Sequence, residues 1–189
     1  MTTPLVVTFV GDDRPGLVNA IADRIAASGG AWLESRSAEL AGKFAGVLLA
    51  NAPDERVAEL EASLRGLETL GLHVTIERGA AEKPKPRRLV RLEIVGHDRP
   101  GIVRDVTRAL SGLNVNIEEF SSDVEGAAFT GVEMFRAAAR LKAPESLPLE
   151  ELRKALETLA AEIMVDLAVG EEAALGPKTW AARPGSPSR

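Results

Sequence analysis

The chain has 189 residues, with 45% hydrophobic and 27% charged side chains, which excludes overall disorder and predicts a folded chain. Its formal net charge of -5 disfavours nucleic-acid binding by the chain as a whole. It contains no cysteine, which excludes disulfides, thiolate metal sites and cysteine nucleophiles.

The N-terminal segment lacks the positively charged region of a secretory signal peptide. No apolar run approaches the roughly 18 residues that span a bilayer. We therefore expect a cytoplasmic protein.

The first half predicts the order βαββαβ. A strand at 5–10 leads into a helix whose apolar residues have helical spacing, namely Leu17, Val18, Ile21 and Ile25. A hairpin follows over 31–40 and 44–50, with Ala41-Gly42 at its turn. The second helix is predicted from Val57, Leu60, Leu64 and Leu67, and a last strand from Leu72, Val74 and Ile76.

The second half repeats this order. The segment Val10-Gly11-Asp12-Asp13-Arg14-Pro15-Gly16-Leu17-Val18 matches Val95-Gly96-His97-Asp98-Arg99-Pro100-Gly101-Ile102-Val103 at an offset of 85. The predicted elements are a strand at 89–95, a helix with Ile102, Val103, Val106 and Leu110, a hairpin over 115–124 and 129–141, a helix with Leu149, Leu152, Leu156 and Leu159, and a strand with Ile163, Val165 and Leu167. The second helices match at an offset of 92, so we expect about seven extra residues in the loop at 142–148.

This order predicts an α+β protein made of two ferredoxin-like domains, each a four-stranded antiparallel sheet with both helices on one face. We expect domains at 1–79 and 89–170. The segment 80–88 has the prolines and charges of a linker, and 171–189 the composition of a poorly ordered tail that contains Trp180.

The repeated Asp-Arg-Pro-Gly turn opens each first helix. Pro15 and Pro100 suit a first helical turn, and Asp13 and Asp98 stand where a side chain can cap it. Gly16 and Gly101 leave the helix entrance without side-chain cover, so that its N–H groups can bind a carboxylate or phosphate. A purely structural turn is the alternative, although Arg14 and Arg99 are not needed to begin a helix.

The motif, followed in the second half by Asn-Ile-Glu-Glu at 116–119, resembles that of ACT domains. The tandem arrangement over residues 3–170 is similar to the glycine cleavage system transcriptional repressor group. The resemblance implies that domains pair and bind an amino acid between the first turn of one domain and the second strand of its neighbour. The implied ligand-binding residues are Asp13, Arg14, Gly16, Asn19, Asp98, Arg99, Gly101 and Asn116. The first half has Trp32-Leu33 where we align Asn116-Ile117, so we expect the better polar site in the second half.

The other functional classes have weaker support. RNA-recognition modules share the element order but need aromatic side chains on the third strand, and we find one in each half, Phe44 and Phe129. Copper chaperones of this fold need cysteine pairs. His97 beside Asp98 is most simply a solvated loop histidine, and no catalytic set, metal-ligand spacing or cofactor motif is found.

The sequence thus predicts a non-enzymatic regulator that binds a small amino acid such as glycine or serine, without cofactor, metal or membrane. It would form a homo-oligomer and act through a protein partner, with no direct contact to nucleic acid, for example as an indirect repressor of glycine cleavage genes. Two alternatives stay open. One is a detached regulatory subunit of a metabolic enzyme, and the other is a structural dimerisation module.

Overall fold

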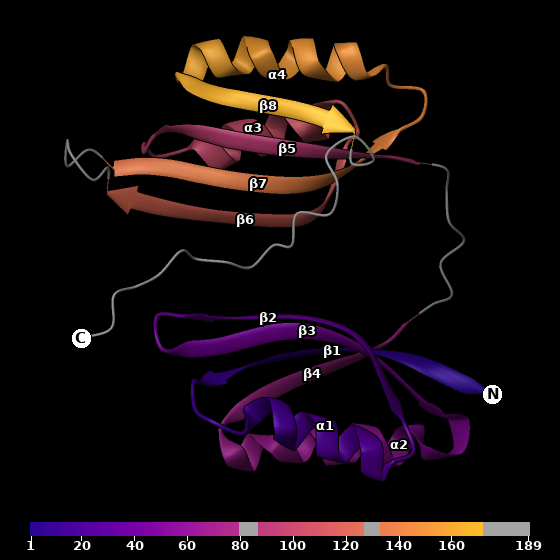
Figure 1. The fold of residues 1–189 in the computed structure, drawn as a ribbon. Helices are drawn as coiled ribbons and strands as arrows, with labels where there is room; N and C mark the ends of the chain where they lie inside the picture. Colours follow the sequence, from indigo (N-terminus) through magenta and orange to yellow (C-terminus); the bar gives the residue numbers. More distant parts are fainter. Residues whose placement is uncertain (80–86, 127–132, 172–189) are drawn as a thin grey trace. The chain divides into compact units, whose positions relative to one another are not determined.

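The computed structural model describes residues 1–79, 87–126 and 133–171, and the chain divides into two compact units, Met1–Lys83 and Pro84–Arg189. The first unit consists of β1 (Thr2–Asp12), α1 (Leu17–Ala27), β2 (Ala31–Leu40), β3 (Lys43–Pro53), the 3-10 helix η1 (Asp54–Arg56), α2 (Val57–Arg65), the 3-10 helix η2 (Gly66–Leu70) and β4 (Leu72–Arg78) (Figure 1). The second consists of β5 (Arg87–His97), α3 (Ile102–Gly112), β6 (Asn116–Gly126), β7 (Glu133–Pro144), α4 (Leu149–Ile163) and β8 (Val165–Glu171).

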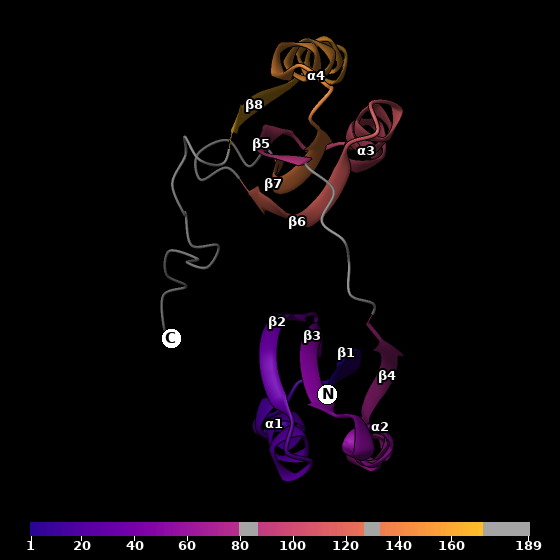
Figure 2. The ribbon, with the colours of Figure 1, turned by 90° about the vertical axis from the view of Figure 1, so that its right-hand side faces the viewer.

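Each unit contains one antiparallel sheet of four strands. The strand orders are β2-β3-β1-β4 and β6-β7-β5-β8. Figure 2 shows the two helices of each unit on one face of its sheet. The predicted pair of ferredoxin-like α+β domains is confirmed.

The core of the first unit lies between the sheet and the helices. Alternation along β1 turns Leu5, Val7 and Phe9 toward the helices, where each is at most 4% exposed. The helices meet this face with Leu17, Ile21, Ile25, Val57, Leu60, Leu64 and Leu67, all of them buried. Val18, which the sequence places on the apolar face of α1, is 50% exposed at the start of the helix.

The core of the second unit follows the same plan. Val90, Leu92 and Ile94 of β5 pack against a helical face that contains Ile102, Val106, Leu110, Leu152 and Leu156. Val103 is 40% exposed, like its counterpart in the first unit. The prediction that Ile163 begins the last strand is wrong, because this residue is buried as the last residue of α4.

Most of the extra residues of the second unit lie in its hairpin. Strand pairing makes Trp32 equivalent to Ile117, 85 positions on, and Leu48 equivalent to Ala139, 91 positions on. The offset therefore grows by six between β6 and β7, where residues 127–132 stand, and by one more between β7 and α4. The prediction that the seven extra residues lie at 142–148 is wrong for six of them, because two helices aligned by their apolar spacing do not show where between them the offset changed.

The boundaries of the elements differ slightly from those predicted. β5 begins at Arg87, which places Arg87 and Arg88 of the predicted linker in a strand. Four further parts of the sequence-based predictions lie outside the described residues, namely Lys83 and Lys85 of the linker, Phe129, most of the tail and Trp180. Within the described ranges, no helix is long and apolar enough to cross a membrane.

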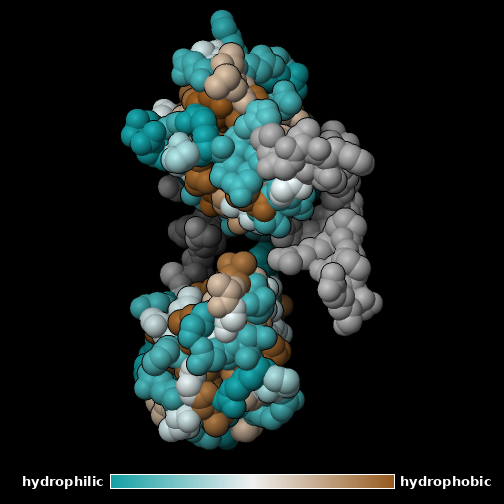
Figure 3. Space-filling model, turned by 90° about the vertical axis from the view of Figure 1, so that its left-hand side faces the viewer, coloured by the Kyte–Doolittle hydropathy of each residue, from teal (hydrophilic) through white to brown (hydrophobic). Residues whose placement is uncertain are grey.

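The sheet faces opposite the helices differ between the units. Val6 pairs with Leu49 on this face of the first unit, and the equivalent pair in the second unit is Arg91 with Arg140. Arg140 forms an ion pair of 3.3 Å with Glu118. Elsewhere the surface is mixed, and Figure 3 shows hydrophobic residues scattered among hydrophilic ones on one side of both units.

The helical segment before the last strand of each unit is followed by a residue in the left-handed conformation, and the residue type differs between the units. Gly71 follows η2 with φ 72°, and Met164 follows α4 with φ 55°. A non-glycine residue in the left-handed conformation destabilises the folded state by roughly 1–2 kcal/mol. Glycine avoids this strain, but part of the gain is offset because glycine makes the unfolded chain more flexible. We expect Met164→Gly to raise the free energy of unfolding of the second unit by up to about 1 kcal/mol. Gly71→Met should lower that of the first unit, and hydrogen exchange of each core reports both values. Equal stability of variant and parent in both units would contradict the assigned strain.

Candidate functional site

The Asp-Arg-Pro-Gly turn joins the first strand of each unit to its first helix. Asp13 leaves β1 with its N–H donating to the carbonyl of Gly42 at 2.9 Å, and Asp98 leaves β5 with the same bond to Glu133 at 2.9 Å. The residue that caps the helix is the glycine. Gly16 has φ 94° and Gly101 has φ 97°, which favours glycine strongly.

The predicted capping by aspartate is wrong. In neither α1 nor α3 does a side chain cap the first N–H groups of the helix. Asp13 and Asp98 stand three residues before the capping glycine. The prolines likewise lie in the turn before the helix and not in its first turn. The aspartates are exposed and play no capping role, so their side chains are available for another purpose.

The entrance of α1 is open. A Cβ placed on Gly16 would meet no heavy atom within 4 Å, and the helix has no side-chain cap. The first N–H groups of a helix have no acceptor within the helix itself. Asn19 stands on the first turn, where its amide donates to Asp23 at 2.8 Å. This entrance therefore presents polar backbone and an exposed amide side chain to solvent.

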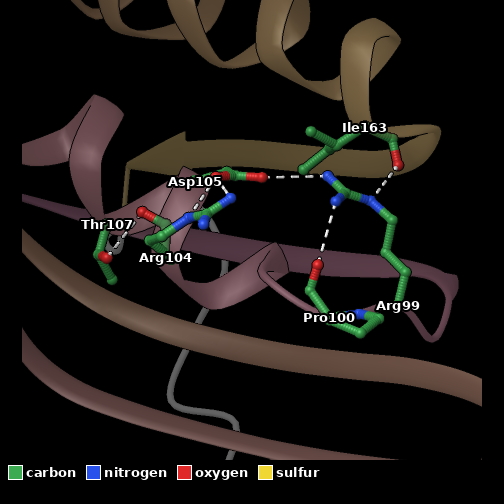
Figure 4. Close-up of polar contacts among 6 residues, drawn as sticks. All are labelled: Arg99, Pro100, Arg104, Asp105, Thr107 and Ile163. Carbon is green, nitrogen blue, oxygen red and sulfur yellow. Dashed lines mark hydrogen bonds and ion pairs between the residues drawn. The ribbon is translucent and has the colours of Figure 1, made fainter.

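The entrance of α3 is partly covered. A Cβ placed on Gly101 would lie 3.1 Å from Nη2 of Arg104, which occupies the position of Asn19. Arg104 donates from Nε to Asp105 at 3.0 Å (Figure 4). The sequence alone assigns no role to Arg104, because the first unit has Asn19 at this position. A guanidinium beside the helix entrance adds positive charge where an anion would bind.

The arginine of each motif bonds to the end of the second helix. Arg14 donates to the carbonyl of Leu70, the last residue of η2. Arg99 donates from Nε to the carbonyl of Ile163, the last residue of α4, at 3.4 Å (Figure 4). The carbonyl end of a helix is the negative end of its dipole, so a cation is favourable there. The arginines, predicted as ligand-binding residues, thus have structural partners.

Arg99 makes two further contacts. Its Nη1 donates to the carbonyl of Pro100 at 3.3 Å, and its Nη2 pairs with Asp105 at 3.2 Å. Hydrogen bonds from Arg104 first, and from Arg99 second, lower the pKa of the Asp105 carboxyl below its ordinary value of 3.8. The guanidinium therefore links the first turn of α3 to the last turn of α4.

Asn116 stands at the opposite end of the sheet from the turn. It pairs with Lys142, which pairs in turn with Leu89, whereas the turn follows His97. His97 lies eight residues along the extended strand from Leu89, a distance of roughly 26 Å. Within one domain, Asn116 and Asp98 are therefore too far apart to hold one small ligand.

The counterpart of Asn116 in the first unit is Ala31 and not Trp32. Ala31 pairs with Asn51, which occupies the position of Lys142, and its N–H donates to the Asn51 side chain at 3.2 Å. Trp32 packs partly against the core of the first unit. The predicted alignment of Trp32 with Asn116 is wrong by one residue, because strand register makes Trp32 the counterpart of Ile117.

The other candidate residues do not assemble a site. Phe44 stacks on Phe9 with ring centroids 5.4 Å apart, on the side of the sheet that packs against the helices, so it presents no free ring to a nucleic-acid base. His97 is exposed beside a hollow of about 430 Å³ that Met134 and Met164 also line. No cluster of three metal-ligating side chains occurs within the described ranges.

Comparison with known proteins identifies both units. Family models described as ACT domains match residues 3–77 and 90–160. The glycine cleavage system transcriptional repressors of Escherichia coli (strain K12) and Shigella flexneri are each 25% identical over 162 residues, covering 84% of this chain and 85% of theirs.

Solved structures share the fold. The crystal structure of a protein from Galdieria sulphuraria has a TM-score of 0.81 at 28% identity, covering 90% of this chain and 99% of its own. The crystal structure of a candidate glycine cleavage system transcriptional repressor has a TM-score of 0.67 at 19% identity, covering 90% of this chain and 97% of its own.

The lowered pKa of Asp105 predicts a pH dependence of stability. Because the folded pKa lies below 3.8, the charged carboxylate stabilises the folded state above that value, and this contribution is lost as the pH falls through the folded pKa. Asp105→Asn should therefore destabilise the protein at pH near 7, and the difference from the parent should shrink as the pH falls below 3.8. Urea unfolding across this range measures the difference. A constant difference at every pH would assign the effect to packing and not to charge.

Proposed function

The chain belongs to the ACT domain family, and from this premise we propose that it is a non-enzymatic regulatory protein that binds a small amino acid. The observation that carries the proposal is the open helix entrance after the Asp-Arg-Pro-Gly turn, with exposed Asp13 and Asn19 beside it. A free amino acid has a carboxylate suited to the helix N–H groups and an ammonium group suited to an aspartate.

The proposed site is completed by a neighbouring ACT domain in a homo-oligomer. One domain cannot supply both halves, because its turn and its second-strand start lie roughly 26 Å apart. The part of the site at the start of the second strand has more polar side chains in the second unit. Asn116 stands there beside Lys142, whose ammonium pairs with Glu118. The first unit has Ala31 there. Conversely, the turn of the first unit is the more open of the two.

The similarity to the glycine cleavage repressors supports glycine as the first ligand to test, with serine as the next small amino acid. We propose that the protein acts through a protein partner in the cytoplasm. The small size of these ligands limits their affinity. Glycine has five heavy atoms, and a ceiling of about 1.5 kcal/mol per atom limits its dissociation constant to the micromolar range or weaker. Such a protein would respond to an abundant metabolite.

The first test is a thermal-shift screen with each of the twenty common amino acids at millimolar concentration. A ligand at one hundred times its Kd should add about 2.7 kcal/mol to the free energy of unfolding. We expect a shift with a small amino acid and little with a large aromatic one. The proposal fails if no amino acid moves the melting curve.

The second test separates binding from stability at the aspartates. Because neither residue caps its helix, Asp13→Ala and Asp98→Ala should each change stability by no more than about 0.5 kcal/mol. The variant that removes a contact to the ligand ammonium should weaken binding by about tenfold or more, as titration calorimetry measures. The two variants are controls for each other and show which turn binds. Unchanged affinity in both would remove the aspartates from the site.

The alternatives have their own readouts. A detached regulatory subunit should bind an amino acid and co-purify with a catalytic partner from lysate. A purely structural dimerisation module should form oligomers, measured by sedimentation, with no response to any amino acid. A regulator of transcription should instead co-purify with a DNA-binding protein.

A further inference from the structure

We propose that the motif arginine of each unit is a positioning residue that couples the helix entrance to the end of the second helix and to the edge strand after it. This inference rests on the proposed function, because the binding of an amino acid at the turn is what would change the coupling. The contacts themselves are features of the ligand-free fold.

The coupling contact occurs in both repeats. Arg14 bonds to Leu70 and Arg99 bonds to Ile163, and each of these carbonyls belongs to the last helical residue before a left-handed residue and an edge strand. The arginine precedes the capping glycine by two residues. Its backbone therefore belongs to the turn that would hold the ligand, while its guanidinium holds the far helix.

Close packing explains why the arginine reaches this carbonyl. The glycine that precedes the motif lies against the start of the edge strand. A Cβ on Gly11 would be 2.5 Å from the carbonyl oxygen of Gly71, and one on Gly96 would be 2.5 Å from Cγ1 of Val165. The turn and the end of the second helix are therefore held side by side, and a change in the turn moves the guanidinium relative to its acceptor.

The second unit has the stronger link. Arg99 contacts Ile163, Pro100 and Asp105, so that it connects the first turn of α3 with the last turn of α4 (Figure 4). Its side chain is 33% exposed. The edge strand that follows is β8, which pairs with β5 alone. A strand held on one side only responds most readily to the loss of a contact at its beginning.

The ligand-free test is hydrogen exchange of the full-length chain. Arg99→Gln should accelerate exchange in the last turn of α4 and in β8 by about tenfold, since a charge-assisted hydrogen bond is lost. Arg104→Gln is the matched control, because Arg104 shares Asp105 with Arg99 and its side-chain contact with Asp105 stays within α3. Arg99→Lys keeps the positive charge but lacks the forked guanidinium. Its exchange rate in β8 should lie between those of the parent and Arg99→Gln. Equal exchange in β8 for Arg99→Gln and Arg104→Gln would overturn the coupling.

A double-variant cycle tests transmission from the turn. Gly101→Ala strains the turn, because Gly101 has φ 97°. We expect it to accelerate exchange in β8 when Arg99 is present and to add nothing in the Arg99→Gln background. Gly16→Ala with Arg14→Gln repeats the cycle for β4, with a smaller effect expected from a single arginine bond. Additive effects of the two changes in both units would overturn the proposal.

The last arm uses glycine at about 10 mM, well above the affinity limit set by its size. Glycine should slow exchange in β8 of the parent and have no such effect in Arg99→Gln, even where that variant still shows a thermal shift. A thermal shift with identical β8 protection in both proteins would overturn the coupling. If no amino acid binds at all, the proposed function fails, and the two ligand-free arms still decide the role of the arginine.

Discussion

The close approach of the first strand to the beginning of the last strand is the constraint on which the motif depends. Gly11 and Gly96 permit it, because any side chain there would collide with Gly71 or Val165. This contact brings the turn beside the end of the second helix, where a carbonyl at the negative end of the helix dipole accepts a bond from the motif arginine. A second glycine then takes a left-handed conformation to start the helix. Most of the repeated segment therefore has a structural explanation in each domain.

What the fold does not explain is more informative about function. Asp13 and Asp98 are exposed at the end of a strand and cap nothing, and the helix entrance beside Asp13 lies open. The lack of a side-chain cap is not special to these two helices, since α2 and α4 have none either, and glycine is a common residue at the cap. The argument for a ligand therefore depends on the combination of open backbone at Gly16 with the exposed carboxylate of Asp13.

The sequence predicts the fold well because period-two and helical patterns survive in both halves. It fails where a segment is aligned one residue off. The repeat offset of 85 already pairs Ala31 with Asn116, and strand pairing, with equivalent bulges between Trp32 and Glu34 and between Ile117 and Glu119, confirms that offset. The capping role given to the aspartates fails for a different reason, because backbone dihedral angles decide which residue caps a helix. The partners of Arg14 and Arg99 lie 56 and 64 positions away and leave no signal in local sequence.

The two repeats have diverged in a complementary way. The first unit keeps an open turn and has Ala31 at the second-strand start, whereas the second unit has Asn116 there and a turn covered by Arg104. The sheet faces opposite the helices differ as well, since the Val6–Leu49 pair is replaced by Arg91–Arg140 with acidic partners. Desolvating these charged side chains would be costly unless their ion pairs stayed intact. The Val6–Leu49 pair carries no such cost, so the same position in the two sheets has different energetics for any contact, although one fold and one motif built both domains.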